Sequence, residues 1–397
     1  MLNKELVTQL SSKNEEPNWI LEKRLEAYEK YTKLSTPLFK YGIGIFLETT
    51  ELDLENIDPI EENSLVITCE DKEVEILTLK DALKKHESII KKYFMNIEDG
   101  KISSLHKAFV NNIKVVVIPE NSYIEKPINI KFSLDNTTSL DQVLIIAKPN
   151  TKVTVIEHSS GKLEKGFRSQ VVEIIAQENA KIEYISVQNF SHKVNNFAQR
   201  KAFVEKDSYV YWLDCILGSK FTQSITTTFL NGTGACSKNL GLFLGDHNQR
   251  YDINVETVHN ASKTNCDMYT KGVLNDSAKN VYRGLVKIQP DSYGCKGYQK
   301  SDTLLLGENT ETDPVPVLEI HNNDVKCGHG ATVGQIDKEK IFYMMSRGLS
   351  EQEAIETIIK GFFDPVLNQL SEDLSEELRQ AINKRVEKGL KGVMINA

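Results

Sequence analysis

The sequence predicts a mainly β protein in which a parallel β-helix lies between an N-terminal region of mixed helices and strands and a C-terminal helical region. Short β-rich runs separated by polar turns recur from about residue 112. The turns centred on Asn150, Asn179, Asp207, Gly232 and Asn260 lie 29, 28, 25 and 28 residues apart. Helical spacing of apolar residues is confined to the two ends of the chain. A period in the twenties is typical of a solenoid, whose coils bury their apolar faces by stacking.

Length and composition indicate how many domains to expect and which class of protein this is. A chain of 397 residues is expected to form two or three domains, and we expect regions 1–110, 111–334 and 335–397. With 40% hydrophobic and 26% charged residues, the composition is that of a globular protein rather than a fibrous or disordered one. A net charge of −8 argues against a dedicated partner among nucleic acids or anionic membranes. The N-terminus has no signal-like apolar segment, and no apolar run is long enough to span a bilayer, so we expect a cytoplasmic protein.

The first hundred residues have mixed character. A helix is expected from Pro17-Asn18-Trp19 to the stop at Ser35-Thr36-Pro37, because its apolar residues recur at helical spacing. Residues 65–79 read as two strands on either side of Glu70-Asp71-Lys72. A second amphipathic helix is expected over residues 79–94.

The β region supplies the repeating unit. Its clearest strands are residues 114–118, 143–147, 172–176, 202–204, 227–230 and 255–258, each followed by a polar turn. Leucine-rich repeats have a similar period, but the leucines at fixed offsets that they require are missing. A parallel β-helix is therefore the preferred interpretation, and a β-sandwich remains the structural alternative because its strands recur at comparable spacing.

The C-terminal 60 residues return to helical periodicity. Asp337 can cap a helix that ends at Gly348, and Ser350 with Glu353 forms a capping box for the next one. Asp364-Pro365 is expected to start a third helix, and residues 371–389 a charged fourth one. No Gly/Ser linker separates this bundle from the β region, so we expect it to pack on the end of the solenoid.

The cysteines exclude several kinds of self-contained site. They are too sparse for a disulfide scaffold and form no C-x-x-C pair, which removes local zinc-ribbon, thioredoxin and ferredoxin motifs. The chain also lacks a G-x-S-x-G nucleophile motif and a P-loop lysine, so no catalytic motif of its own is predicted. A lone Cys215 is read as a core residue, because free cysteines are among the most buried residue types.

The segment 319–334 is the richest in candidate ligands, with two histidines, one cysteine and two acids within 16 residues. Cys327 and His329 are two residues apart, so on a strand they project from the same face. A thiolate and an imidazole suit iron, zinc or copper, and the flanking Gly328 and Gly330 leave room for a close partner. Two ligands do not complete a site, so the others would come from elsewhere in the chain or from a second subunit. The alternative is a buried cysteine and a hydrogen-bonded histidine at the end of the solenoid.

This segment also carries a family resemblance. Residues 324–335 closely resemble a motif of the SufB/SufD family of iron-sulfur cluster assembly proteins, the SufD branch in particular. Further matching pieces follow in family order along nearly the whole chain. They are residues 16–19, 24–27, 106–109, 115–119, 184–189, 282–285, 301–307, 342–343 and 346–350.

The resemblance implies a right-handed parallel β-helix between helical parts, in a cytoplasmic complex with the ABC-type ATPase SufC. Two β-helix subunits, SufB with SufD or two copies of one kind, would pair through their β-helices, with a transient iron or nascent iron-sulfur cluster near the interface. The motif's histidine and cysteine match His329 and Cys327. No tightly bound cofactor is expected in the isolated protein.

SufC would dock on the C-terminal helical region. Phe342, Tyr343, Arg347 and Leu349 are the expected contacts there. The alternative is that the two aromatic residues form the core of the helical bundle.

Departures from the family pattern bear on the role. Ser301 stands where SufB scaffolds carry a cysteine, and Gly330 stands where they carry a glutamate, which favours a SufD-like accessory subunit. Gln188-Asn189 and Asn322-Asn323 look SufB-like, and Cys215 matches a sulfur-receiving SufB cysteine if a two-residue gap is allowed. A homodimeric SufB-like scaffold using Cys215 or Cys327 is therefore the alternative. A β-helix carbohydrate-active enzyme is a remote third, because the β region shows no clear pair of carboxylates.

Overall fold

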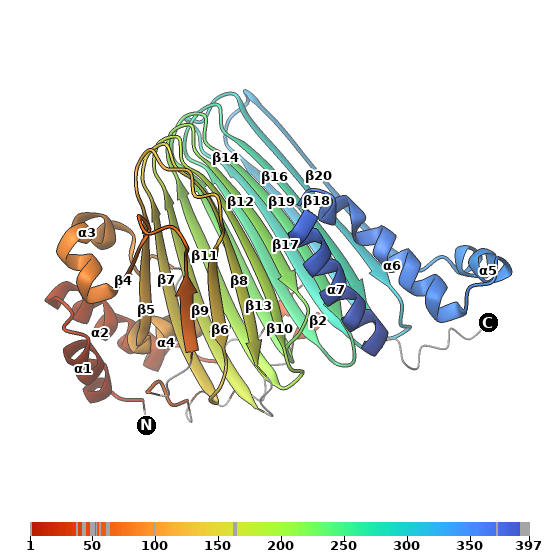
Figure 1. Cartoon of the computed structure of the whole chain (residues 1–397), viewed down its shortest axis with the longest axis horizontal. Coiled ribbons are helices and arrows are strands. Elements are labelled where there is room, and N and C mark those ends of the chain that lie inside the picture. The colour runs from red at the N-terminus through yellow and green to blue at the C-terminus, as the bar shows by residue number, and fades with distance from the viewer. Residues whose placement is uncertain are drawn as a thin grey trace.

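The computed structural model describes residues 2–36, 39–41, 45–47, 52, 54, 57–60, 64–97, 100–161, 165–370 and 372–389. It is a parallel β-solenoid of about eight turns with helices at its N- and C-terminal ends (Figure 1). The predicted mainly β fold is thereby confirmed. The β-sandwich alternative is excluded, because the strands from β5 onward pair in parallel, which a sandwich of antiparallel sheets does not do.

Two nine-stranded sheets form the solenoid, and each coil contributes one strand to each sheet. Sheet I contains β3 (Ser64–Thr68), β6 (Ile128–Ser133), β8 (Lys152–Gly161), β10 (Lys181–Phe190), β12 (Tyr209–Ile216), β14 (Cys236–Gly245), β16 (Asn265–Leu274), β18 (Cys295–Leu305) and β20 (Val325–Gln335). Sheet II contains β4 (Glu75–Thr78), β5 (Asn112–Ile118), β7 (Thr138–Ala147), β9 (Gly166–Ala176), β11 (Val194–Val204), β13 (Phe221–Leu230), β15 (Arg250–His259), β17 (Lys279–Ile288) and β19 (Glu311–Ile320). The predicted strands in residues 65–79 are present as β3 and β4, which start the two sheets as antiparallel strands.

The turns from sheet II to sheet I repeat one backbone conformation. Asn121, Asn150, Asn179 and Asp207 all have positive φ, between 54° and 58°. Asparagine and aspartate tolerate this left-handed conformation better than other non-glycine residues. The side-chain amide of Asn150 donates to Asn121 Oδ1 at 2.8 Å, and that of Asn179 donates to Asn150 Oδ1 at 2.9 Å. In the later coils the left-handed residues are Gly234 and Lys263 rather than the predicted turn centres at 232 and 260.

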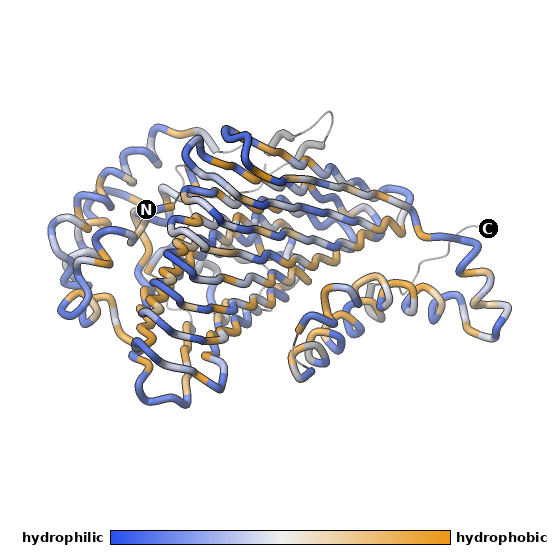
Figure 2. Tube along the Cα trace, turned by 90° about the horizontal axis from the view of Figure 1, so that it is seen from above, coloured by the Kyte–Doolittle hydropathy of each residue, from blue (hydrophilic) through white to orange (hydrophobic). Residues whose placement is uncertain are grey.

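Figure 2 shows the stacked coils of the solenoid coloured by the hydropathy of each residue. Burial alternates along strands such as β8, because successive side chains of a strand point to opposite faces of the sheet. Because the strands are in register, inward residues form rows that run along the solenoid axis. One row in sheet I is Ile182, Val210, Ser237, Cys266, Gly297 and Cys327. The next row is Tyr184, Trp212, Asn239, Met268, Gln299 and His329. A residue in such a row is covered by the next coil, unless it lies on the last one.

The N-terminal helices are α1 (Lys4–Lys13), α2 (Asn18–Lys33), α3 (Leu79–Tyr93) and α4 (Lys101–Phe109). The two predicted helices correspond to α2 and α3. Apolar residues of α1, α2 and α4 share one core with the outer face of sheet II, including Phe109, Leu144 and Phe197. A fully buried ion pair between Arg24 and Glu16, 2.6 Å apart, ties the start of α2 into this core, and Arg24 also donates to the Ala108 carbonyl of α4.

The C-terminal helices are α5 (Lys338–Ser346), α6 (Glu351–Leu367) and α7 (Glu372–Gly389), and residue 371 lies outside the described part. The Asp337 cap and the Ser350–Glu353 capping box are present. The predicted helix start at Asp364-Pro365 is wrong, because Pro365 lies inside the last turn of α6, where the buried Phe363, Val366 and Leu367 hold the helix on the protein. No described helix is both long and apolar enough to cross a membrane.

The bundle does not pack on the end of the solenoid as expected. Its α6 contacts β14 and β16, and residues of α6 and α7 share a core with Leu213, Leu240 and Leu242 on the outer face of sheet I. Although the sequence of α7 is rich in charged residues, four of its apolar residues are buried in this core: Leu374, Leu378, Ile382 and Val386. The last coil therefore stays uncovered by these helices, while α5 projects outward (Figure 1).

Candidate functional site

The last coil of the solenoid is an open end. β20 is hydrogen-bonded to β18 alone and β19 to β17 alone among the described strands, so both are edges about ten residues long. Every residue of β19 and β20 is at least partly exposed, including the apolar Val317, Ile320 and Val333. Long exposed edges with apolar side chains are usually avoided in monomeric proteins, because they template pairing with another strand.

Cys327 and His329 lie on β20, in this open coil. Their strand partners on β18 are the buried Gly297 and Gln299, so both side chains belong to rows that face the interior. His329 is exposed, and its ring makes no hydrogen bond or ion pair with another residue that the structure describes. The alternative of a hydrogen-bonded histidine therefore does not describe His329 in this structure. Gln299 lies behind it and donates to the Val317 carbonyl at 2.9 Å, which links the two sheets at this level.

Cys327 is half-buried and has a different environment from its neighbour. It packs against the interior core, and a Cβ placed on Gly297 would lie 3.4 Å from the sulfurs of both Cys266 and Cys327. Burial raises the pKa of the Cys327 thiol above its usual range, so in the isolated chain it is a thiol. A metal ion would have to displace this proton to use the sulfur as a ligand.

The two positions that depart from the SufB pattern lie beside this pair. Ser301 is buried on β18 opposite Ala331, and its hydroxyl has no partner in the described structure. Gly330 lies on the opposite face of β20, where a Cβ would have 3.9 Å to Lys300 and to the Tyr298 hydroxyl. A carboxylate at position 330 would therefore not point to the same side of the strand as His329.

Sequence reasoning missed a second histidine and cysteine pair deeper in the solenoid. His259 Nε2 lies 3.3 Å from Cys266 Sγ, and its Nδ1 lies 2.7 Å from the Thr264 hydroxyl. Burial lowers the pKa of His259 to about 4 and raises that of Cys266 to about 12. The pair is therefore a neutral imidazole and a thiol, which makes it a packing element rather than a reactive ion pair. The sequence signal for this pair was the spacing of seven residues across a turn, which places His259 and Cys266 on inward rows of consecutive strands.

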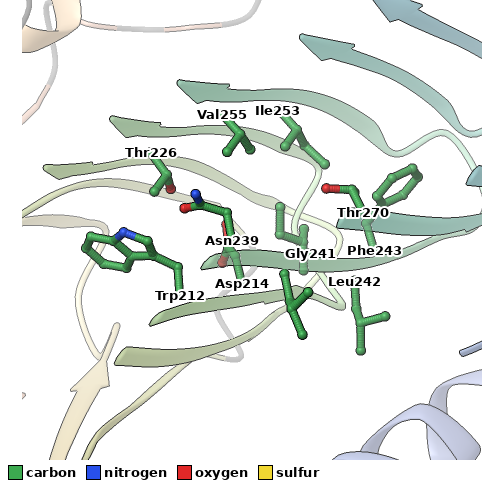
Figure 3. A pocket seen from close by; sticks show the side chains of 12 residues that line it. Trp212, Asp214, Thr226, Asn239, Gly241, Leu242, Phe243, Ile253, Val255 and Thr270 are labelled. Carbon is green, nitrogen blue, oxygen red and sulfur yellow. The ribbon is translucent and has the colours of Figure 1, made fainter. Parts of the chain in front are cut away.

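A cavity inside the solenoid lies apart from the open end. It has a volume of about 20 Å³, enough for about one water molecule, and is lined by Trp212, Asp214, Asn239 and neighbouring residues of β12 to β16 (Figure 3). Both side-chain polar atoms of Asn239 and Oδ1 of Asp214 have no partner among the described residues. Met268 and Gln299 separate Asn239 from His329 in their common row, so the cavity and the open end are two places.

Cys215 lies far from the Cys327 and His329 pair in the fold. It is 1% exposed on the outer face of sheet I, in the core beneath the C-terminal helices. Burial holds the pKa of this thiol well above its usual range. The reading of Cys215 as a core residue describes its position here, and a sulfur-handling role would need the overlying helices to move.

The expected docking residues are on and beside α5. Phe342 is 73% and Tyr343 60% exposed, so neither forms the bundle core. Arg347 donates to the Tyr343 hydroxyl at 3.2 Å and stacks over its ring, while Leu349 is half-buried. The neighbouring Ile341 is the residue of α5 that packs inward. Two exposed aromatic rings and a guanidinium on one projecting helix are typical of a protein contact.

Comparison with known proteins gives consistent matches. Residues 131–362 match the family model described as the SufBD core domain of SUF system FeS cluster assembly. Proteins named iron-sulfur cluster assembly SufBD family protein are similar to the chain over nearly its whole length. Those from Staphylococcus epidermidis and from Staphylococcus aureus strain MRSA252 are 26% identical, and that from Staphylococcus saprophyticus is 27% identical. Each alignment covers 97% of this chain and 93% of the relative.

Proposed function

Because the chain belongs to the SufBD family of iron-sulfur cluster assembly proteins, we propose that it is a SufD-like, non-enzymatic subunit of a cytoplasmic Suf complex. In this proposal it pairs through the open end of its solenoid with a SufB-type subunit or a second copy of itself. It also binds a SufC-type ATPase through its C-terminal helices. The family match gives no support to the carbohydrate-active alternative.

The exposed imidazole of His329 on the edge strand of the last coil is the observation that carries the proposal. Imidazole and thiolate groups are both known ligands of iron in cluster sites. His329 presents a free ring where a second subunit would meet β20, with the Cys327 thiol two residues away. Iron or a nascent cluster is the cargo of this site, held transiently, and the partner subunit supplies the remaining thiolate and carboxylate ligands.

The functional test is His329→Ala in the assembled complex. We expect normal folding and normal ATPase binding but loss of cluster formation, because the substitution removes an exposed ligand and no packing. His321→Ala is the matched control, since His321 is also exposed near the start of β20 and contacts only Glu319, at 2.9 Å. Equal cluster yields from the wild type and His329→Ala would refute the assignment.

Pairing through the open end has its own test. Val333→Asp places a charge on β20, and Val66→Asp places one on β3, the opposite end of the same sheet. The two valines are 42% and 46% exposed, so neither substitution disturbs a buried core. We expect Val333→Asp alone to weaken subunit pairing in size-exclusion chromatography with light scattering. Equal loss of pairing in both variants, or in neither, would contradict the assigned interface.

The ATPase contact is tested by Phe342→Ala with Tyr123→Ala as control. Both rings are strongly exposed, but Tyr123 lies in the first coil of the solenoid. Phe342→Ala is expected to reduce copurification of the ATPase at least about tenfold, as expected for a buried aromatic anchor of an interface. If copurification of the ATPase is undiminished, Phe342 is not part of the contact, and the ATPase binds another part of the helical region.

A specific observation favours one second candidate, the homodimeric scaffold. Cys327 stands beside His329 and gives the chain a thiol of its own at the open end. Anaerobic reconstitution of the isolated protein with iron and sulfide separates the two roles. A cluster chromophore that disappears in Cys327→Ser supports the scaffold, whereas absence of a chromophore on the wild type supports the accessory subunit.

A further inference from the structure

Three polar turns meet at one edge of the solenoid, away from the open end. His192 follows β10, Asp246 and His247 follow β14, and Asp276 follows β16. All lie in turns from sheet I back to sheet II, so the coils stack them along one side. The intervening turn after β12 carries the small Gly218 and Ser219, and the two histidine rings approach each other with centroids 5.0 Å apart.

The distances within this group differ from those of a hydrogen-bonded network. Asp246 Oδ1 lies 3.6 Å from His192 Nδ1 and 3.5 Å from His247 Nδ1. One nitrogen from each ring and an oxygen of the carboxylate all lie within 4.8 Å of one another. Ligands on a tetrahedral ion with bonds of about 2.1 Å are separated by about 3.4 Å, so the two distances from the carboxylate oxygen to the imidazole nitrogens suit a common ion better than direct hydrogen bonds.

A fourth oxygen is available from the next coil. Asp276 Oδ2 lies 3.7 Å from His247 Nδ1 and accepts the backbone N–H of His247 at 2.9 Å. This hydrogen bond fixes the turn that carries His247 and leaves the carboxylate with further lone pairs. The group therefore offers two imidazole nitrogens and two carboxylates.

The proposed ligands differ in how far they are buried. Asp246 is 3% exposed on its side chain, while His247 is 64% exposed. Asp246 also lines a small hollow of about 10 Å³ between the ends of β14 and β16 and the helices α6 and α7. The two imidazoles, 35% and 64% exposed, are thus the solvent-facing members of the group, and Asp246 is its buried member.

Arg385 pairs with the Asp246 carboxylate and would compete with a metal ion for it. Its Nη2 lies 3.1 Å from Asp246 Oδ1 and 3.2 Å from Gln249 Oε1, which joins α7 to this edge. A guanidinium explains why a buried carboxylate is tolerated here. It does not explain why two histidine nitrogens are directed at the same oxygen without hydrogen-bonding to it.

We propose that His192, Asp246 and His247, with Asp276 as a fourth ligand, form a binding site for a divalent first-row transition metal ion. Imidazole nitrogens select zinc, cobalt, nickel, copper and iron over magnesium and calcium, which prefer oxygen ligands. Two histidines and one carboxylate are also the ligand set of non-haem Fe(II) sites. The site does not depend on the function proposed for the open end, and it shares no residue with Cys327 and His329.

The test uses the full chain without a histidine tag and Co²⁺ as the probe. Binding is followed by the visible absorption of the bound ion and by equilibrium dialysis at neutral pH. We expect one equivalent to bind with an absorption band of tetrahedral intensity, and a 100-fold excess of Mg²⁺ to leave it in place.

Two variants assign the ligands. His247→Ala and His192→Ala are each expected to weaken Co²⁺ binding at least about tenfold, since loss of a single supporting group already has that effect at metal sites. His321→Ala is the control, because it removes an exposed histidine that faces one carboxylate and no second histidine. His247 is mostly exposed, so its substitution tests the site even where His192→Ala unfolds the turn. Equal Co²⁺ affinity in His247→Ala and the wild type would overturn the proposal.

Discussion

The buried carboxyl of Glu173 is expected to make the stability of the protein depend on pH. Glu173 on β9 is fully buried and accepts the backbone N–H groups of Met95 and Asn96, at 3.2 and 2.8 Å, and the amide of Gln142 at 2.8 Å. It thereby fastens the segment after α3 to the solenoid. Burial raises the pKa of Glu173 to about 7, against 4.5 for the free side chain, because these donors compensate only part of the lost hydration.

The sign of the effect follows from proton binding. Between pH 4.5 and about 7 the folded state holds a proton on Glu173 that the unfolded state has lost, so this group makes the free energy of unfolding fall as pH rises. A shift of this size corresponds to about 3 kcal/mol in total, at about 1.4 kcal/mol per pH unit. The contribution is complete above pH 7 and absent below pH 4.5.

The assay is urea unfolding of the wild type and Glu173→Gln between pH 4 and 8. The glutamine keeps an oxygen for the two N–H groups, and Gln142 can turn its amide, whose Oε1 has no partner in the described structure. Glu173→Gln should gain about 3 kcal/mol relative to the wild type as pH rises across this range. Buried histidines such as His106, whose pKa burial lowers to about 3, act in the opposite direction but cancel in the difference. Glu178→Gln, on the surface, is the control, and a pH-independent difference for Glu173→Gln would refute the reasoning.

Four further predictions concern the fold, each checked by urea or thermal unfolding. Gly272→Ala should destabilise the protein by about 1 to 3 kcal/mol, because its Cβ would lie 1.8 Å from the ring of Phe243. Gly361→Ala, with nothing within 4 Å of the new Cβ, should stabilise α6 by about 0.5 to 1 kcal/mol, and equal effects of the two glycine variants would contradict the packing. Asn150→Ala should cost about 1 to 2 kcal/mol, since it puts alanine at a φ of 58° and breaks the ladder, and Asn150→Gly should cost less. Ser350→Ala removes the capping box of α6 and should cost about 1 kcal/mol, and no loss would mean that packing alone fixes that helix end.

Much of the fold could be predicted because the repeat constrains it at each coil. The polar turns gave the period, and the structure places left-handed residues at or within three positions of them. The helices α1 and α4 were missed for different reasons. Asn3 does cap α1, but the helix has only two buried apolar residues. α4 is buried almost all round, so Ser103, Ser104 and His106 interrupt the amphipathic pattern that a surface helix would show.

The packing between segments that are distant in the sequence could not be predicted from the sequence. The expectation that the helical bundle caps the solenoid failed because the outer face of sheet I carries apolar residues along β12, β14 and β16, and the apolar residues of α6 and α7 are buried against them. The cluster of His192, Asp246 and His247 was missed for a related reason. Its members are 54 and 55 residues apart, which is two coils, and a search for histidines at twice the repeat would have found them.

The availability of His329 follows from its place in the order of coils. Tyr184, Trp212, Asn239, Met268 and Gln299 occupy the same inward row, and all five are buried because a further coil covers each of them. His329 is the sixth member and is exposed only because the solenoid ends there. Its neighbour in the adjacent row, Cys327, is half-buried for the same reason. If a second solenoid continues the stack, it covers both groups at once, so completion of the proposed site and pairing of the subunits are one event. Variants that weaken pairing, such as Val333→Asp, should therefore lose cluster formation in proportion to the complex lost, whereas His329→Ala should lose it within intact complexes.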